Sequence, residues 1–333
     1  MAQNSTNLDH PQHIAIVGAG GEIGSHMTRE LLRTKKHQIT ALTRAESTNT
    51  FPDGVLGKRV DYEDQSSIVD TLCGKDVLII TLAGNAPPDQ EAKLIEAAAE
   101  AHVAWVIPNE WGLDSDDKSL AEVLILGEMK QKTRRGDTNT LVCGFWYEFI
   151  LAGGAERFSF DFPNRTVTFY DDGSTKINTS TLGQCGRAIA QVLSLNVHAA
   201  GNEKDGPTLS QFRNRPVYVS SFLVSQKDMF ESVLRVTGAT EGDWKIKYQD
   251  VKQRYAEGKA EMEKGDMTGL VKLLYARDFF VNGGGNYEAS RGLHNGTVGI
   301  HVSRATVRLE RSVNICLLLL RMEVEGGGCG QSP

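Results

Sequence analysis

The chain has 333 residues, 40% of them hydrophobic, enough to bury a sizeable core in one large domain or two modest ones. Its formal net charge of −6 argues against a nonspecific nucleic-acid binder, because phosphate contacts need clustered Lys and Arg, and the densest basic patch, Lys130–Arg135, is short. The five cysteines show neither Cys-x-x-Cys spacing nor a grouping with histidine, which predicts reduced thiols and no metal site.

The first predicted unit is a strand, a glycine turn and a helix within residues 14–32. Ile14–Val17 is a continuous apolar run, and an apolar helical face with Ile23 and Met27 follows the turn. In such a unit the glycines let the backbone approach a pyrophosphate, and the helix N-terminus supplies N–H groups for its charge. The alternative is a plain glycine turn in an α/β domain. The predicted cofactor-binding residues here are Gly18, Gly20, Gly21, Glu22, Ile23 and Gly24.

The second predicted strand, Gln38–Thr43, indicates which dinucleotide binds. An acidic residue at its end would favour NAD, whereas a basic one would pair with the 2′-phosphate of NADP. Arg44 follows the strand directly and no Asp or Glu stands at its end, so we predict NADPH (NADP+) as the cofactor. A solvated Arg44 paired with Glu46 is the alternative.

The alternation of apolar runs and helical stretches continues to about residue 150. It predicts an α/β fold, a Rossmann-type doubly wound parallel sheet, over residues 12–150. Ala83 and Gly84 follow the fourth strand and are expected to line the cofactor crevice. The further predicted strands are Val55–Val60, Val77–Leu82, Val103–Ile107 and Thr140–Trp146, and the predicted helices are Gln65–Leu72, Pro87–Ala101 and Leu120–Arg135.

Residues 151–295 predict a smaller, mixed α/β substrate region. Thr166–Tyr170 alternates with the two-residue period of a half-exposed strand, and a turn signal follows it. The other predicted elements are a short strand at Val217–Val219 and helices at Gly186–Leu195, Ser225–Thr237 and, as one or two helices, Asp250–Leu274.

A Tyr-x-x-x-Lys spacing at Tyr248–Lys252 resembles the proton-transfer pair of many reductases of this architecture. It lies past the sixth predicted strand, about a hundred residues further along the chain than a pair beside the nicotinamide would. Both residue types are also common enough for a chance match. We therefore do not assign it a role.

The segment after the fifth predicted strand carries a family resemblance. Pro108-Asn109-Glu110-Trp111-Gly112 stands where the cofactor crevice must lie, and Lys-x-x-x-Arg-Arg follows at 130–135. Together with the glycine turn, these motifs resemble the isoflavone reductase-like branch of the NmrA-like family, the atypical short-chain dehydrogenases/reductases. That branch has Pro-Ser-Glu-Phe-Gly in its plant members, and Asn109 and Trp111 look closer to fungal, CipA-like oxidoreductases. The resemblance covers roughly residues 12–295.

The resemblance implies roles for several residues. A lysine on the helix after the fifth strand handles the proton in this family; Lys130 matches it, with Lys132 as the fallback and a solvated helix lysine as the alternative. Pro108, Asn109 and Lys130 are expected at the cofactor. Asn109 and Glu110 would orient the nicotinamide ribose or the lysine, with Glu110 at the substrate or, as the alternative, a helix cap. The aromatic residues expected to wall the substrate pocket, although residues of this kind are often core, are Phe145, Trp146 and Tyr147.

The resemblance implies an NADPH-dependent reductase. It would deliver hydride to a conjugated C=C, C=O or C=N bond of a small metabolite, in fungal secondary metabolism, with a lysine as proton donor. The alternative is a redox sensor, because some NmrA-like proteins bind dinucleotide without catalysis.

Residues 296–333 lack the amphipathic helix that usually ends family members, and they predict either a divergent tail or a product of faulty gene-model splicing. His294, just before this tail, is a weak candidate for the substrate pocket. The apolar run Ile315–Leu320 is too short to span a bilayer, and the polar N-terminus lacks a signal peptide's apolar segment. We expect a soluble cytoplasmic protein, monomer or homodimer, without nucleic-acid or membrane partners.

Overall fold

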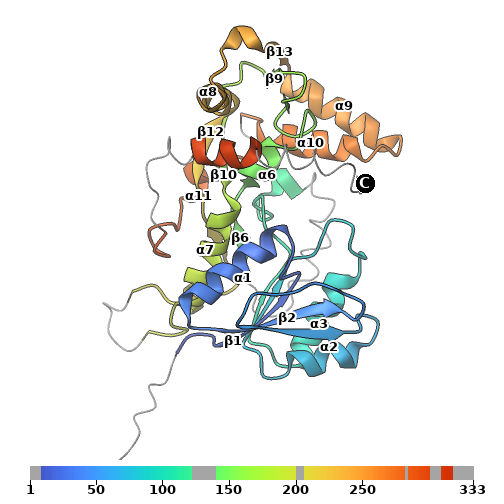
Figure 1. Ribbon diagram of the computed structural model, residues 1–333, viewed down its shortest axis with the longest axis vertical. Helices are drawn as coiled ribbons and strands as arrows, with labels where there is room; N and C mark the ends of the chain where they lie inside the picture. The colour runs from blue at the N-terminus through green and yellow to red at the C-terminus, as the bar shows by residue number, and fades with distance from the viewer. Residues whose placement is uncertain (1–8, 122–139, 200–205, 282–283, 301–308, 318–333) are drawn as a thin grey trace, which may run out of the picture.

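A five-stranded parallel sheet forms one end of the protein (Figure 1). The computed structural model describes residues 9–121, 140–199, 206–281, 284–300 and 309–317. The strand order is β3-β2-β1-β4-β5, with the chain crossing over between β3 and β4 as in a doubly wound sheet. The strands are β1 (His13–Val17), β2 (Gln38–Arg44), β3 (Val55–Val60), β4 (Val77–Ile80) and β5 (Trp105–Ile107).

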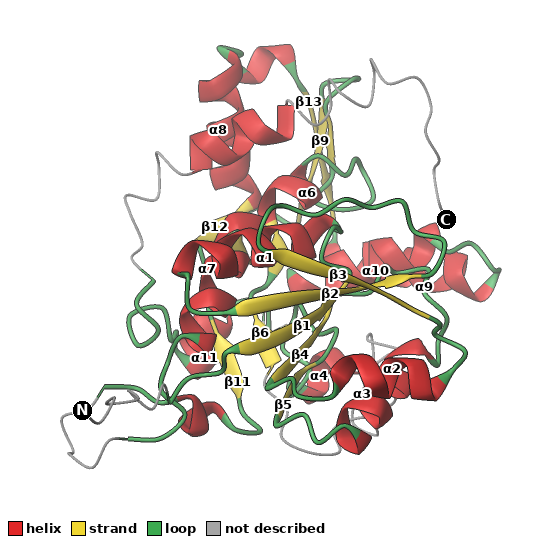
Figure 2. Ribbon diagram, turned by 60° about the horizontal axis from the view of Figure 1, so that its bottom comes forward, coloured by secondary structure: helices red, strands yellow, loops and turns green. Residues whose placement is uncertain are grey.

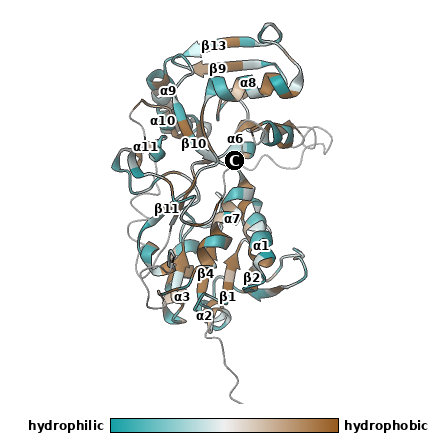
Figure 3. Ribbon diagram, turned by 90° about the vertical axis from the view of Figure 1, so that its left-hand side faces the viewer, coloured by the Kyte–Doolittle hydropathy of each residue, from teal (hydrophilic) through white to brown (hydrophobic). Residues whose placement is uncertain are grey.

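The strands at the centre of this sheet are apolar because helices cover both faces (Figures 2 and 3). Ile14 and Ile16 of β1 point into a core shared with α1 (Glu22–Thr34) and α7 (Leu182–Leu193). The alternating Ala15 and Val17 point into the opposite core, under α2 (Gln65–Leu72) and α3 (Gln90–Glu100). The predicted Rossmann-type α/β fold is therefore confirmed.

The predicted sixth strand, Thr140–Trp146, was wrong as a single element. It is two strands, β6 (Thr140–Val142) and β7 (Phe145–Trp146), separated at Gly144, which has φ +63°. A side chain at Gly144 would collide with the carbonyl of Asn178, so the glycine permits a close backbone approach there. Neither strand joins the five-stranded sheet: β6 pairs in parallel with β11 (Pro216–Tyr218), and β7 with β10 (Lys176–Ser180).

The rest of the chain forms a second lobe around its own core. One small sheet has the order β12-β10-β7 and another β13-β9-β8. Its remaining strands are β8 (Phe160–Asp161), β9 (Thr166–Tyr170), β12 (Phe222–Ser225) and β13 (Lys245–Gln249). The helices are α6 (Tyr147–Leu151), α8 (Gln226–Thr237), α9 (Val251–Glu263), α10 (Thr268–Asp278) and α11 (Tyr287–Arg291).

Segments from beyond residue 150 return to the first lobe. Helix α7 lies along α1 (Figure 1), and Val217, Val298 and Ile300 join the same core.

The division of the chain into residues 12–150, 151–295 and 296–333 stays a prediction. Among the described residues, every helix is too short or too polar to cross a bilayer. The start of the predicted helix Leu120–Arg135 overlaps the short α4 (Lys118–Ala121), and the rest of that range lies outside the described residues.

Candidate functional site

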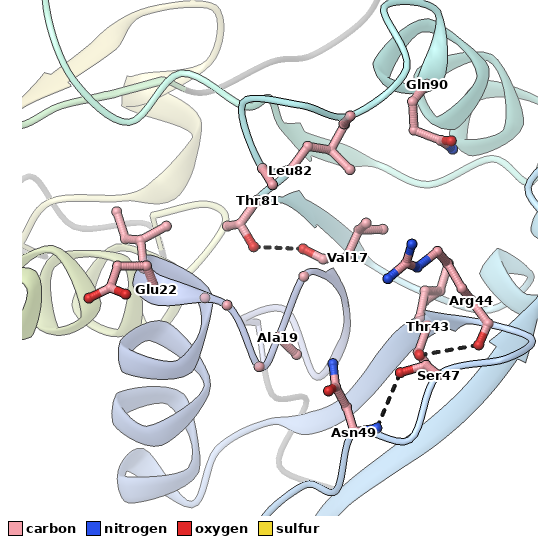
Figure 4. A pocket seen from close by; sticks show the side chains of 18 of the residues that line it. Val17, Ala19, Glu22, Thr43, Arg44, Ser47, Asn49, Thr81, Leu82 and Gln90 are labelled. Atoms are coloured by element: carbon pink, nitrogen blue, oxygen red, sulfur yellow. Dashed lines mark hydrogen bonds between the residues drawn. The ribbon is translucent and has the colours of Figure 1, made fainter. Parts of the chain in front are cut away.

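A pocket opens at the carboxyl ends of β1, β2 and β4 (Figure 4). This glycine-turn pocket has a volume of about 700 Å³ and runs from Arg44 and Asn49 at one end to Trp146 and Phe149 at the other. The predicted cofactor residues that line it are Gly18, Gly20, Gly21, Glu22, Ile23, Gly24, Arg44, Ala83 and Gly84.

The turn itself is tight because the backbones of β1, β4 and α1 touch. Gly18 has φ +77°, and a Cβ on it would collide with the carbonyl of Thr81. A Cβ on Gly24 would collide with the carbonyl of Gly18. The Thr81 hydroxyl donates to the Val17 carbonyl at 2.7 Å, which ties β4 to β1 at this point.

Helix α1 opens directly on the pocket. Its N-cap is Gly21, which has no side chain to accept a hydrogen bond from the first-turn N–H groups. Those groups and the positive end of the helix dipole therefore suit an anionic group such as a pyrophosphate. A Cβ on Gly21 would meet only the Gly18 carbonyl, at 3.2 Å, so the space above the turn is open to a ligand.

Arg44 lies at the end of the pocket formed by β2, beside Thr43, Ser47 and Asn49 (Figure 4). Its side chain is 75% exposed, and its Nε lies 3.4 Å from Oε1 of Glu46. The guanidinium thus lines the pocket and also contacts the carboxylate that the sequence offered as its alternative partner. Among the described residues, no acidic side chain lines the pocket at this end, and the one acidic lining residue, Glu22, belongs to α1.

A second, aromatic pocket of about 270 Å³ adjoins the first and shares Leu82, Trp146 and Phe149 with it. Its walls come from the segment after β5, from Gly144 to Ile150, and from α10. Four of the predicted residues line it: Asn109, Glu110, Phe145 and Trp146.

Three hydrogen bonds and a cation–π contact hold the residues at the junction of the pockets. The indole N–H of Trp146 donates to the Trp111 carbonyl at 2.9 Å, and that of Trp111 to the Ile80 carbonyl at 2.7 Å. The Arg157 guanidinium lies 4.3 Å from the centre of the Phe149 ring and donates to the Phe149 carbonyl. Phe149 and Arg157 were missed in the sequence because neither belongs to a motif.

The segment after β5 is a support for the pockets as well as a wall. The Asn109 amide exchanges two hydrogen bonds with the backbone of Leu82, at 3.1 and 3.3 Å, and so fixes the chain that follows β4. Glu110 is buried and accepts a hydrogen bond from the Ser115 hydroxyl. Pro108 lines neither pocket.

Tyr147 lies in the core of the second lobe and lines neither pocket, unlike its neighbours Phe145 and Trp146. It begins α6, and this change from strand to helix turns its side chain inward. The side chain is fully buried, and burial raises the pKa of its phenol well above the usual value. Its expected place on the substrate pocket is corrected accordingly.

The remaining candidates either line neither pocket or lie outside the described residues. Lys130 and Lys132 lie outside the described residues. Tyr248, in β13, is 64% exposed and lines neither pocket, in keeping with its exclusion above. His294 accepts a hydrogen bond from the Tyr218 N–H at 3.0 Å and also lines neither. No cluster of three potential metal-ligating side chains occurs in the described ranges.

Comparison with known proteins agrees with this geometry. A family model described as NAD(P)H-binding matches residues 18–123. The oxidoreductase aprR of Aspergillus flavus is 26% identical over 273 residues, covering 78% of this chain and 85% of that protein. The isoflavone reductase homolog IRL of Zea mays is 33% identical over 153 residues, covering 42% of this chain and 48% of that protein. The chain is an NAD(P)H-binding oxidoreductase that resembles the isoflavone reductase-like family.

Solved structures show the same fold. A chain from the crystal structures of pinoresinol-lariciresinol and phenylcoumaran benzylic ether reductases superposes with a TM-score of 0.71 at 20% identity, covering 90% of this chain and 98% of that one. The crystal structure of isoflavone reductase gives a TM-score of 0.67 at 19% identity, covering 90% and 99%. This isoflavone reductase-like chain therefore shares its architecture with reductases across almost the whole length of those structures.

Proposed function

We propose that the protein is an NADPH-dependent reductase that delivers hydride to a conjugated C=C, C=O or C=N bond of a small metabolite. The observation that carries this proposal is the junction of the two pockets at Leu82, Trp146 and Phe149. The bound dinucleotide supplies the hydride. The glycine turn would hold its pyrophosphate and the aromatic end of the pocket its nicotinamide, so that a substrate in the aromatic pocket lies next to it.

The preference for NADPH rests on Arg44. A guanidinium at the end of β2 can form charge-assisted hydrogen bonds to the 2′-phosphate, and no carboxylate of the described residues lines the pocket there to bind the 2′-hydroxyl of NADH. The contact with Glu46 is between two side chains that are more than two-thirds exposed, so it is weak and a phosphate can replace it.

Proton supply is assigned to Lys130, on the family resemblance of its spacing to the two arginines, with Lys132 as the alternative. A lysine near a cationic nicotinamide and partly removed from water acquires a lower pKa, which suits general acid–base catalysis near neutral pH.

The biological setting that we propose is fungal secondary metabolism, in the CipA-like branch of the family. The support is the likeness to fungal oxidoreductases, aprR and also poxI of Penicillium oxalicum, the latter 24% identical over 277 residues. We propose a small-molecule substrate as the partner and a monomer or homodimer as the assembly.

The alternative function is a redox sensor that binds dinucleotide without catalysis. A sensor needs no second pocket beside its nicotinamide end, and the aromatic pocket therefore favours the enzyme. The deciding experiment is NADPH oxidation by the purified protein with a panel of enones, imines and ketones. Turnover of any class supports the reductase, whereas tight NADPH binding with no turnover across the panel supports the sensor.

Substitution of the lysine tests the mechanism. Lys130→Met is expected to keep NADPH affinity within a few-fold while lowering turnover about 10²- to 10⁴-fold, the usual size of a general acid–base contribution. Lys132→Ala is the control and is expected to be mild. A fully active Lys130→Met beside an inactive Lys132→Ala would move the role to Lys132, and full activity in both would remove the lysine mechanism.

A further inference from the structure

Glu148 of α6 is a buried carboxylate in the chain segment that forms the aromatic end of the glycine-turn pocket. Its neighbours in the chain, Trp146 and Phe149, line both pockets, whereas Glu148 lines neither and is 5% exposed. Its carboxylate accepts the N–H of Leu182 at the start of α7, at 3.2 Å. A group that can carry a negative charge therefore lies in the wall beside the two aromatic residues at which the pockets meet.

The starts of α1 and α7 both face this carboxylate. Glu22 stands at the start of α1, at the opposite side of the pocket from Arg44 (Figure 4). Burial raises the pKa of Glu148 to about 7; the negative charge of Glu22 adds to this rise, and the Arg187 guanidinium of α7 opposes it. The titratable and charged groups that interact with Glu148 are Glu22, Tyr147, Cys185 and Arg187.

Within this set, Glu148 is the group whose charge changes near neutral pH. A hydrogen bond with Cys143 and burial raise the pKa of Cys185 well above its ordinary value, and burial does the same for Tyr147, so both are neutral near pH 7. Exposed glutamates and arginines keep their charges in this range. The charge in the wall therefore changes mainly at Glu148 between about pH 6 and about pH 8.

The two redox forms of the cofactor differ in charge at the nicotinamide. The ring of NADP+ carries a positive charge and that of NADPH carries none, whereas the phosphates of the two are the same. An ionised carboxylate attracts the cationic ring and has no comparable attraction for the neutral one. Because the carboxylate is buried, water and salt screen this attraction less than they would at the surface.

We infer that Glu148 determines the relative affinities of the protein for NADP+ and NADPH: its ionised form favours NADP+, and its protonation removes that advantage. The inference rests on the proposed function, because it is that proposal which places the nicotinamide beside Trp146 and Phe149. A reductase with this property retains NADPH better at acidic pH and retains its oxidised product better at alkaline pH.

The test measures the Kd values of NADPH and NADP+ by calorimetry from about pH 6 to about pH 8. In the wild type the ratio Kd(NADPH)/Kd(NADP+) is expected to rise about two- to fivefold over this range, as Glu148 ionises. In Glu148→Gln the ratio is expected to stay constant. Titration of the phosphates and changes in stability affect both ligands alike, so they cancel in the ratio.

Asp278→Asn is the matched control, because Asp278 is also a buried acid, with a pKa that burial raises to about 8, and it lines neither pocket. This variant is expected to keep the wild-type rise. If Glu148→Gln fails to fold, the wild type alone supplies a test. Near pH 7, NADP+ is expected to release more protons on binding than NADPH, as measured by calorimetry in two buffers of different ionisation enthalpy.

Four results would overturn the inference. These are a constant ratio in the wild type, an equal rise in Glu148→Gln, equal proton release by the two cofactors, and a rise that survives in Glu148→Gln but disappears in Lys130→Met. The last result would assign the effect to the lysine. Failure of the wild type to bind either cofactor would refute this inference together with the dinucleotide cradle.

Turnover of the panel of enones, imines and ketones decides the proposed function separately. If the wild type reduces a member of the panel while its Kd ratio stays constant with pH, the inference fails and the reductase proposal stands. If the ratio depends on Glu148 but no member of the panel is reduced, the reductase proposal fails and the role of Glu148 in cofactor binding stands.

Discussion

The glycines of the turn differ in what occupies the space where a side chain would lie. At Gly18 and Gly24 the space of a side chain is filled by protein backbone, so these residues serve the packing of β1, β4 and α1. At Gly21 that space is nearly open and faces the pocket, so this residue serves the ligand. Stability and dinucleotide affinity should therefore respond to different positions within one short motif.

Gly21→Val is expected to abolish dinucleotide binding with a stability loss of about 1 kcal/mol or less, because its side chain projects into the space needed by the pyrophosphate. Gly24→Val is expected to unfold the protein at lower temperature, since its Cβ would collide with backbone. NADPH titration and thermal unfolding check both variants. Unchanged NADPH affinity in Gly21→Val would refute the assignment of the cradle.

Arg44→Ala is expected to weaken NADPH binding by about 1.5–3 kcal/mol, the range for hydrogen bonds to a charged group, and to leave NADH binding nearly unchanged. Titration with both cofactors measures the difference. Lys58→Ala is the control, because Lys58 is exposed on the neighbouring β3 but does not line the pocket. Equal losses for the two cofactors in Arg44→Ala would show that Arg44 does not bind the 2′-phosphate.

At the scale of elements, the contact between α1 and α7 connects the two halves of the chain. Helix α7 contains two glycines, which are costly inside a helix unless packing requires them. At Gly186 a Cβ would lie 2.5 Å from the His26 carbonyl of α1, whereas at Gly183 the nearest atom is a side-chain nitrogen of Arg187, 3.5 Å away. Only Gly186 is therefore needed for the helices to meet.

Gly186→Ala is expected to destabilise the protein by about 1–3 kcal/mol, because the two helices must separate. Gly183→Ala is expected to be neutral or to stabilise by up to about 1 kcal/mol, the ordinary gain of alanine in a helix. Denaturant unfolding of the two variants gives the comparison. A stability loss in Gly183→Ala equal to that in Gly186→Ala would contradict a specific close approach at Gly186.

For the molecule as a whole, Glu148 links the two lobes. Its neighbours Tyr147 and Ile150 belong to the core of the second lobe, and its carboxylate accepts the N–H of Leu182 at the start of α7, at 3.2 Å. Burial raises the pKa of Glu148 from 4.5 to about 7. The folded protein therefore holds this proton more tightly than the unfolded chain does.

Because the folded state binds more protons between pH 4.5 and 7, the contribution of Glu148 to the free energy of unfolding falls as the pH rises through this window. The loss is about 3 kcal/mol at most and is complete above pH 7. Glu148→Gln is expected to remove this part of the pH dependence. Asp278, whose pKa burial raises to about 8, acts in the same direction but is common to both proteins and cancels in their difference. Parallel stability curves for wild type and Glu148→Gln from pH 4.5 to 8 would contradict the raised pKa.

The sequence by itself determined the elements whose signals are local. Continuous apolar runs such as Ile14–Val17 mark strands buried on both faces. Local patterns of other kinds also sufficed, and the ranges Val55–Val60, Gln65–Leu72 and Thr166–Tyr170 agree residue for residue with the structure. The glycine turn and Arg44 were predicted for the same reason, because a dinucleotide cradle is built from one short segment of chain and the strand next to it.

Only the tertiary structure decided which distant segments meet. An apolar run shows that a strand is buried but not what it pairs with, so the break at Gly144 and the pairing of β6 and β7 with strands from the second half of the chain had no local signal. The direction of Tyr147 depended on a change from strand to helix at one residue. Tyr275 reaches the pocket because α10 packs beside Phe145, and a contact across 130 residues is decided by the packing of whole elements, not by the spacing of neighbours.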